Sequence, residues 1–424
     1  MKVLGVIAEY NPFHNGHKYH ISQAINASGA DFTVAVISGS FVQRGEPSFF
    51  EKHIRASLAL QNGVDLVLEL PALFSSAGAE YFAHGGVSAL NALGIITHLS
   101  FGCENADLQN IKKIASTLLE EPPKVSATIK NTLKQGVSYP RAREIALKEA
   151  LGIPEGFISK PNNILAIEYL KSLFRLNSSI IPLPVSRIGS NYKDTTFTTD
   201  SIQHPVASSY FASASAIRAY IYENFPTNMM LSFSDTLSEY LPQNTLDELW
   251  TQLKLGTIPS FNKLDAHILT YFRYANPSEI RKLPYISEGL ENKLRTAAQK
   301  AVTSDEFFKL CTSARYPESR IRRIAASIFT GVTAELLEEG KAKGVPYIRV
   351  LGMGERGQIL LKHIKKTASL PIVTKPAVLN KLVQTPFEIS VAKSESRATD
   401  TFYLSLFSPK SAGLDFKISP IIDC

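Results

Sequence analysis

The chain has 424 residues, 44% of them hydrophobic, which is enough for about two or three domains with a real core. No apolar run reaches the roughly 20 residues that span a bilayer, and Met1 leads directly into an apolar run, so we expect neither a membrane helix nor a signal peptide. The net charge is +7, with 26 basic against 20 acidic residues in 225–424, an excess that fits either a polyanionic partner or an ordinary solvated surface.

Short apolar runs alternate with segments of helical periodicity in the first part of the chain. We expect strands from Val3 and at Phe32–Ser38, Leu66–Leu70 and Ile95–Phe101, and helices at His17–Ser28, Phe50–Asn62 and Ala79–Leu93. This alternation favours an α/β fold with a doubly wound parallel sheet. Ligands of such sheets bind at the carboxyl ends of the strands. Three loops are expected there, at Tyr10–Gly16, Gly39–Pro47 and Gly102–Asn105.

The rest of the chain predicts mostly helices. Residues 107–176 and 230–340 are expected to be mainly helical, and 345–424 to mix short helices with strands. Within these parts we expect strands at Ile180–Val185, Ile348–Leu351 and Phe402–Phe407, a mobile loop at Gly189–Gln203 and a helix at Ser215–Glu223. Because the character changes at Pro226, we expect an α/β domain over 1–224 and a basic, mainly helical region over 225–424 with a small α+β end.

The most informative motif is His14-Asn15-Gly16-His17, which follows the first strand and opens the first helix. Backbone amides and the helix dipole at such a junction favour a phosphate. The two imidazoles add donors to phosphate oxygens, and Gly16 leaves no side chain to block a nucleotide. This H-x-G-H signature is typical of nucleotidyltransferases, so His14 and His17 are the candidate catalytic residues.

Other uses of histidine and cysteine are weaker. Two histidines three residues apart are often ordinary, partly buried side chains. A zinc site needs a second ligand pair, and none has suitable spacing, so we predict no metal site. Cys103, Cys311 and Cys424 form no pair motif, which argues against a disulfide framework and suits a reducing cytoplasm.

Loops at the other strand ends supply further candidates. Arg44 in Ser38–Pro47 is either an anion ligand or a solvated side chain. Gly102 either lets an adenine lie against bare backbone or serves a simple turn. Arg187 and Asn162 either face the same strand ends or are structural, with Asn162 as the N-cap of a helix at Ile164–Leu176.

A second anion site is predicted where Ser213-Ala214-Ser215-Ala216-Ile217-Arg218 opens a helix. Ser213 and Ser215 offer hydroxyls beside free amides, with Arg218 one turn further, although serine is also a commonplace N-cap. The motif has no lysine, so neutralisation of phosphate charge falls to Arg218, His14, His17 or a metal.

Basic residues gather in the second half. Arg315, Arg320, Arg322 and Arg323 lie on or beside a predicted helix with one apolar and one basic face, which either contacts RNA or is simply solvated. Gly352-x-Gly354-x-x-Gly357 matches a dinucleotide fingerprint by spacing. We expect no well-formed βαβ unit around it and, with Arg356 inside it, favour a surface that contacts a nucleic-acid backbone.

With these motifs together, the chain resembles the bacterial tRNA(Met) cytidine acetate ligase family of the H-x-G-H nucleotidyltransferase-like superfamily, over nearly its whole length. The resemblance is carried by GVIAEYNPFHNGHKYH at 5–20, SGSFVQRGEP at 38–47, FGCE at 101–104, PNNILAIEYL at 161–170, PVSRIG at 184–189, SASAIR at 213–218, LPYISEGL at 283–290 and RVLG at 349–352.

The resemblance implies an ATP site and a reaction. The implied ATP-binding residues are Ile7, Ala8, Glu9, Tyr10, Asn11, Pro12, Phe13, His14, Asn15, Gly16, His17, Lys18, Tyr19, His20, Gly102, Asn162, Arg187 and Ile188, to which the second anion site adds Ser213, Ser215 and Arg218. Cys103 stands where a serine is expected, which a backbone contact from Gly102 should tolerate. The implied reaction acetylates N4 of the wobble cytidine of elongator tRNA(Met), using acetate and ATP through acetyl-adenylate.

The expected partners are therefore ATP, acetate and this tRNA, with no membrane and no DNA, and magnesium stays open. We expect Arg315, Arg320, Arg322 and Arg323 to hold the anticodon stem. Two alternatives remain open from the residues alone. One is an adenylyltransferase acting on a small phosphorylated metabolite, which usually needs only one compact domain. The other is a non-catalytic RNA-binding protein with a vestigial nucleotide pocket.

Overall fold

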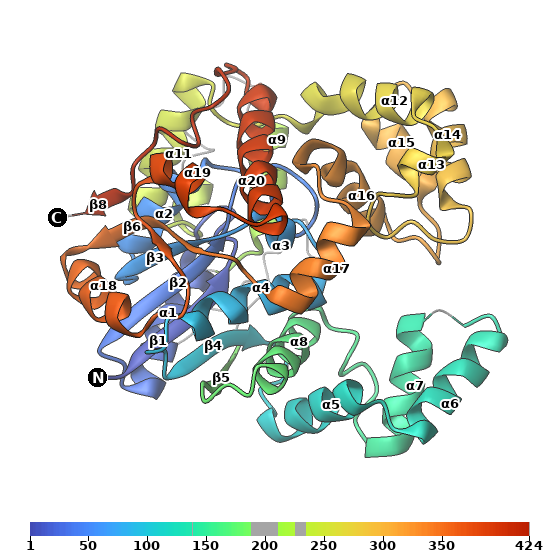
Figure 1. Ribbon diagram of the computed structural model, residues 1–424, viewed down its shortest axis with the longest axis horizontal. Coiled ribbons are helices and arrows are strands. Elements are labelled where there is room, and N and C mark those ends of the chain that lie inside the picture. Colours follow the sequence, from blue (N-terminus) through green and yellow to red (C-terminus); the bar gives the residue numbers. More distant parts are fainter. Residues whose placement is uncertain (138, 188–210, 225–234, 424) are drawn as a thin grey trace.

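The computed structural model describes residues 1–137, 139–187, 211–224 and 235–423 (Figure 1). The loop expected at Gly189–Gln203, the predicted site residue Ile188 and Cys424 lie outside the described residues. Cys103 and Cys311 are buried free thiols. Among the helices that the structure describes, none combines the length and the apolar character that crossing a bilayer requires.

The centre of the molecule is a mixed, mostly parallel sheet. Its strands run in the order β5-β4-β1-β2-β3-β6-β7, with β8 paired to β6. The first five strands are mutually parallel, as predicted, and they are β1 (Val3–Ala8), β2 (Phe32–Ser38), β3 (Leu66–Leu70), β4 (His98–Cys103) and β5 (Ile181–Ser186). Because the order reverses direction at β1, the carboxyl ends of β1, β2 and β4 flank a crevice of the kind that binds ligands.

Helices cover both faces of the sheet. In β2, Val34 and Val36 are buried in one core, and Ala35 and Ile37 in the other, which is the alternation that a sheet covered on both sides requires. The first core is closed by helices that include α4 (Ala79–Ala92), α5 (Leu108–Glu120), α8 (Pro161–Arg175), α17 (Ala334–Lys343) and α18 (Glu355–Thr367). The second is closed by α1 (Asn15–Ser28), α2 (Lys52–Leu60), α9 (Ala214–Asn224) and α11 (Gln243–Leu255).

Two helical bodies project from this core (Figure 1). One, formed by α6 (Pro123–Lys134) and α7 (Tyr139–Leu151), has a small core of its own. The other has a separate core that also includes Phe41 and Ala398. It comprises η1 (Phe261–Leu264), α12 (Asp265–Tyr274), α13 (Pro277–Ile280), α14 (Leu290–Lys300), α15 (Ser304–Cys311) and α16 (Glu318–Thr330). The remaining short helices are α3 (Ala72–Ser75), η2 (Pro376–Val378) and α19 (Leu379–Leu382).

The sheet crosses the division expected near residue 225. β6 (Ile348–Gly354) pairs antiparallel with β3, and β7 (Ile372–Val373) and β8 (Ile421–Asp423) pair parallel with β6. The C-terminal part of the chain thus adds β6, β7 and β8 to the N-terminal sheet.

The strand predicted at Phe402–Phe407 is wrong. These residues end α20 (Pro386–Ser405) and begin the segment after it. A capping box between Thr385 and Glu388 starts this helix, and Ala398 and Phe402 are buried one turn apart on the same face. The apolar residues at the end of the helix follow the 3.6-residue period of α20, which cannot be recognised within the six residues Phe402–Phe407 alone.

The expectation that no βαβ unit surrounds Gly352-x-Gly354-x-x-Gly357 is also wrong, because β6, α18 and β7 form one. The third glycine nevertheless serves packing. A Cβ on Gly357 would lie 1.9 Å from the carbonyl oxygen of Asp65. Arg356 donates from Nε to the Asp65 carboxylate at 2.8 Å, so the amino end of α18 is held against the residue that precedes β3.

A buried ionic cluster joins the C-terminal part to the sheet. Lys52 Nζ lies 2.6 Å from Glu69, 2.5 Å from Asp415 and 3.1 Å from Glu395. Arg349 lies 2.8 Å from Asp415. All five side chains are at most 2% exposed, so the charged members of the cluster stabilise one another.

Candidate active site

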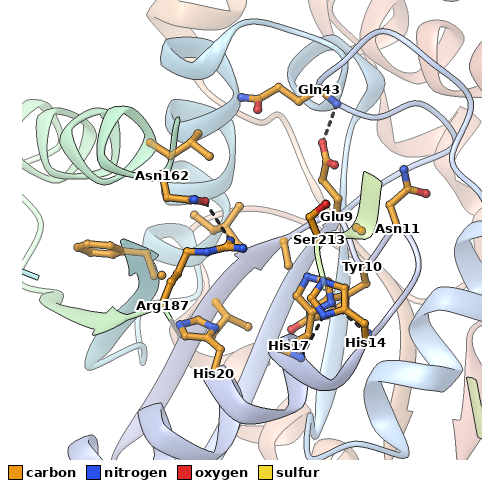
Figure 2. Close-up of a pocket in the computed structure, with 18 of the residues that line it drawn as sticks. Glu9, Tyr10, Asn11, His14, His17, His20, Gln43, Asn162, Arg187 and Ser213 are labelled. Atoms are coloured by element: carbon orange, nitrogen blue, oxygen red, sulfur yellow. Dashed lines mark hydrogen bonds between the residues drawn. The ribbon is translucent and has the colours of Figure 1, made fainter. Parts of the chain in front are cut away.

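A cavity opens at the carboxyl ends of β1, β4 and β5, beside the amino end of α1 (Figure 2). Most of the predicted nucleotide-site residues line it: Ile7, Ala8, Glu9, Tyr10, Asn11, His14, Gly16, His17, Tyr19, His20, Gly102, Asn162, Arg187, Ser213, Ser215 and Arg218. The fold thus brings together segments that are up to about two hundred residues apart in the sequence. The candidate anion ligand Arg44 lines the cavity as well, and the structure adds Val6, Gln43, Phe82, Phe101, Leu165, Tyr169, Val185, Ser186 and Ala214.

The backbone fixes the two histidines of the motif. His14 is the N-cap of α1, and its Nδ1 accepts a hydrogen bond from Gly16 N at 3.0 Å. The amide of His14 donates to His17 Nδ1 at 3.3 Å, which completes a capping box. Since each Nδ1 accepts, each neutral ring carries its proton on Nε2. The rings stack with centroids 3.7 Å apart, so two N–H donors are held side by side.

These imidazoles are neutral at pH 7. Burial lowers the pKa of His14 to about 3, and the nearby charges of Arg187 and Arg218 act in the same direction. Burial, with the neighbouring His14 ring and the charge of Arg187, holds the pKa of His17 well below its ordinary value. The pair therefore offers hydrogen-bond donors, while the positive charge at the cavity comes from arginines.

Several residues of the predicted run lie away from the cavity. Phe13 is buried, with its ring centroid 5.5 Å from that of His17. Pro12 is also buried and Lys18 is exposed. Asn15 turns outward and donates from Nδ2 to the carbonyl of Glu239 at 2.9 Å. None of these four side chains lines the cavity.

On the β4–β5 side, Arg187 Nη1 lies 3.4 Å from Asn162 Oδ1 (Figure 2). Gly102 lies against the Arg187 side chain on this wall, where a Cβ would be 3.4 Å from Arg187 Cγ. Cys103 is buried, does not line the cavity and directs its thiol toward the carbonyl of Val185. Cys103 in place of the expected serine therefore does not alter the cavity wall.

Asn162 is not the N-cap of its helix. The helix begins at Pro161 with Lys160 as the N-cap, and Asn162 lies in the first turn. Glu104 satisfies this turn, accepting from Asn162 N at 3.2 Å and Nδ2 at 2.7 Å and from Asn163 N at 2.9 Å. The role of Glu104 was missed, because its partners lie more than fifty residues away and no local signal points to them.

On the β2 side, the loop after β2 reaches the cavity with Gln43 and Arg44. Arg218 comes from α9 and lies 2.8 Å from Glu46 in this loop. Ser213 accepts from Ala216 N at 3.1 Å and so caps the start of that helix. The second predicted anion site is thus part of the same cavity.

The four arginines expected on a basic surface make intramolecular contacts. Arg315 is exposed and pairs with Glu288. Arg320 donates to the carbonyl of Tyr285, and Arg322 pairs with Glu318 and Asp305. Arg323 Nη1 lies 3.4 Å from the carbonyl oxygen of Gln43, so α16 touches the loop that borders the cavity.

Within the part of the chain that the structure describes, no group of three or more histidine, cysteine, aspartate or glutamate side chains is arranged to hold an ion.

Comparisons with known proteins agree with this geometry. The model of the family described as HIGH Nucleotidyl Transferase matches residues 1–413. The tRNA(Met) cytidine acetate ligase of Acetivibrio thermocellus is 41% identical, and that of Thermoanaerobacter sp. (strain X514) is 38% identical, each with 100% of both chains covered.

Solved structures agree as well. The crystal structure of apo Thermotoga maritima TmcAL is 34% identical, covers 100% of this chain and 99% of that chain, and superposes with a TM-score of 0.90. The same protein bound with alpha-thio ATP is 33% identical at the same coverage, with a TM-score of 0.88. The chain therefore belongs to the HIGH nucleotidyl transferase family and, within it, to the tRNA(Met) cytidine acetate ligases.

Proposed function

We propose that the protein joins acetate to N4 of the wobble cytidine of elongator tRNA(Met), in the cytoplasm, at the expense of ATP. The observation that carries this proposal is the pair His14 and His17, whose Nε2–H groups are held side by side at the start of α1 within a cavity. The names of the relatives at 38–41% identity support tRNA(Met), cytidine and acetate as substrates, and the related structure bound with alpha-thio ATP supports ATP. The proposed division of labour is that 1–224 activates acetate and 225–424 holds the tRNA.

The chemistry explains why ATP is needed. Acetate is a poor acyl donor because oxide or hydroxide would have to leave. N4 of cytosine is a poor nucleophile because its lone pair is delocalised into the ring. An acetate oxygen attacks the α-phosphorus and displaces pyrophosphate, and the resulting acetyl-adenylate has AMP as a good leaving group. N4 then attacks the acetyl carbon.

The proposed role of His14 and His17 is electrostatic and positional. Their fixed Nε2–H groups donate to the oxygens of the α-phosphate and of the departing pyrophosphate, where charge builds up in the transition state. Because the rings are neutral, Arg187 and Arg218 supply the positive charge. Removing one such donor is expected to lower the rate by about 10²–10³.

The tRNA is proposed to lie across the body formed by α12–α16. A wobble base sits in an exposed loop and can be splayed out into a cavity. α16 supports this placement because its backbone packs on the loop beside the cavity: a Cβ on Gly45 would lie 2.6 Å from Arg322 backbone atoms. Arg315 and Arg320, at the amino end of α16, are proposed to contact the anticodon stem.

The test is incubation with ATP, radiolabelled acetate and bulk tRNA, followed by mass spectrometry of the nucleosides. The proposal expects label in tRNA as N4-acetylcytidine and acetate-dependent exchange of pyrophosphate into ATP. A stable dinucleotide formed from a phosphorylated metabolite, with no label in tRNA, would replace it by the adenylyltransferase alternative.

A further inference from the structure

Resting on the proposed function, we infer that the carboxylate of Glu9 binds the N4 amino group of the target cytosine and takes its proton during acetyl transfer. The resemblance to the family implies that Glu9 binds ATP. We instead assign its side chain to the cytosine of the tRNA.

The position of Glu9 separates it from the expected nucleotide side. Glu9 follows directly after β1, the strand at which the sheet order reverses. Arg187, Asn162 and Gly102 occupy the β4–β5 side of the cavity. Figure 2 shows Glu9 reaching toward Gln43 instead, on the β2 side, where its Oε1 accepts from Gln43 N at 2.8 Å. Adenosine on the β4–β5 side leaves the β2 side of the cavity for the base that receives the acetyl group.

Glu9 is held rigidly at this place. Its carbonyl oxygen accepts from Arg55 Nη1 at 2.7 Å, and the amide of Gln43 fixes Oε1. Oε2 has no hydrogen-bond partner among the described residues, and Glu9 lines the cavity. A fixed carboxylate with one oxygen available is an acceptor for an amino group.

Two other residues of the cavity lining carry buried donors. Asn11 is 2% exposed, and its Oδ1 accepts from Phe49 N, which identifies the other amide atom as Nδ2. Asn11 Nδ2 and Gln43 Nε2 are both buried without an acceptor in the described structure, although both side chains line the cavity. Unpaired buried donors are rare and indicate a missing partner.

This set of groups matches cytosine. The base presents an N4 amino donor next to the N3 and O2 acceptors. In protein–DNA complexes, Asp and Glu carboxylates accept hydrogen bonds from cytosine N4. Glu9 supplies the acceptor, and Asn11 and Gln43 supply donors of the kind that N3 and O2 need. Uracil would place its O4 acceptor against the Glu9 carboxylate, so the same group rejects it.

The proton balance of the step is complete. N4 attacks the acetyl carbon and a C–N bond forms. The bond from that carbon to the phosphate oxygen breaks and AMP leaves with the electron pair. One N4 proton passes to Glu9 and is later released to solvent.

Burial raises the pKa of Glu9, and the nearby charge of Glu46 raises it further. The Gln43 amide, Arg218 and Arg44 lower this pKa, but burial outweighs them. A more basic carboxylate is better suited to this transfer.

The test compares Glu9→Gln and Glu9→Asp with wild type in two assays. Acetate-dependent exchange of pyrophosphate into ATP reports acetyl-adenylate formation. Single-turnover acetylation of an unmodified elongator tRNA(Met) transcript by enzyme loaded with ATP and acetate reports transfer. We expect Glu9→Gln to retain exchange within about threefold and to lose transfer by about 10²–10⁴, with partial recovery in Glu9→Asp. Glu155→Gln is the matched control, because Glu155 is exposed and pairs with Lys148 of α7, and it should leave both assays unchanged.

Wild-type transfer should slow as pH falls and Glu9 takes up a proton, and Glu9→Gln should lack this dependence. Equal loss of exchange and transfer in Glu9→Gln would overturn the inference, as would unchanged transfer. Should Glu9→Gln fail to fold, a pH-independent transfer step in wild type would overturn it instead. A wild-type enzyme without acetate-dependent exchange contradicts the proposed function, whatever Glu9 does.

Discussion

Arg218 and Glu46 form an ion pair of 2.8 Å at the wall of the cavity, and Arg218 also donates to the carbonyl of Asn11 at 2.7 Å. The guanidinium that sequence patterns assign to an anionic ligand is therefore already oriented by a carboxylate and a carbonyl. A phosphate or acetate oxygen would share it with Glu46.

This arrangement predicts opposite effects for the two partners. Arg218→Ala should lower acetate-dependent pyrophosphate exchange by about 10²–10³, because it removes fixed positive charge from the reacting phosphates. Glu46→Gln should lower the KM for ATP by a factor of about 3–10, because Arg218 then lacks a competing anion. Steady-state exchange kinetics measure both, and a raised KM in Glu46→Gln would contradict the account.

Histidine burial predicts an acid-sensitive stability. Burial lowers the pKa of His14 to about 3 and of His20 to about 4, while unfolded histidine titrates near about 6.5. Below that pH the unfolded state binds protons that the folded state does not, so the free energy of unfolding falls by up to about 1.4 kcal/mol per pH unit for each histidine. Above about pH 7 both states are neutral and the effect vanishes.

Urea denaturation at pH 5 and pH 7 measures this slope. His14→Asn keeps a good N-cap and should show a shallower fall than wild type. The matched change at exposed His267 should leave the slope as it is. Equal slopes in His14→Asn and wild type would show that His14 is not held neutral.

Much of the fold and of the cavity follows from local patterns. The five parallel strands are short apolar runs, and His14, Gly16 and His17 sit where the strand-to-helix junction was predicted. Period and capping are encoded within a few residues of each element, so they can be recognised without the partners. The same reliance on local pattern explains why the strand predicted at Phe402–Phe407 is wrong. Six residues are too few to show the period of the 20-residue helix α20, to which Phe402–Ser405 belong.

Long-range pairing could not be predicted. Nothing near Glu104 indicates that it satisfies the first turn of α8, and nothing near Ile348 indicates that β6 pairs antiparallel with β3. The basic surface was expected from composition, yet Arg322 is compensated by Glu318 and Asp305. Whether a charged side chain is solvated or paired depends on tertiary neighbours, which periodicity does not reveal.

The buried ionic cluster predicts unequal costs for two similar substitutions. Glu395 is held protonated at neutral pH, because burial and the nearby charge of Glu69 raise its pKa to about 8. The positive charges of Arg349 and Lys52 outweigh burial and lower the pKa of Glu69. Glu395→Gln should therefore change stability at pH 7 by less than about 1 kcal/mol, whereas Glu69→Gln should cost about 3–5 kcal/mol by leaving buried cations uncompensated.

The pH dependence separates the two roles. Between about pH 4.5 and 8 the unfolded Glu395 carboxyl is ionised while the folded one keeps its proton, so stability contributed by this group declines as pH rises. Glu395→Gln should remove that decline. Thermal melts from pH 5 to 9 measure it, and a Glu395→Gln variant that loses several kcal/mol at pH 7 would mean that the carboxylate is charged.

The proposed tRNA surface is tested by charge reversal. Arg315→Glu together with Arg320→Glu should weaken binding of tRNA(Met) at least tenfold and reduce its salt dependence by about one phosphate contact per arginine. Acetyl-adenylate formation should be retained. Lys254→Glu, on the exposed face of α11, is the matched control. Unchanged tRNA affinity in the double variant would show that the tRNA does not bind at Arg315 and Arg320.

The most direct measurement is a crystal structure of this protein with a non-hydrolysable ATP analogue. We predict α-phosphate oxygens within hydrogen-bond distance of Nε2 of both His14 and His17, and adenosine on the side of Gly102 and Arg187. A triphosphate bound away from both imidazoles, with the amino end of α1 unengaged, would contradict the central claim.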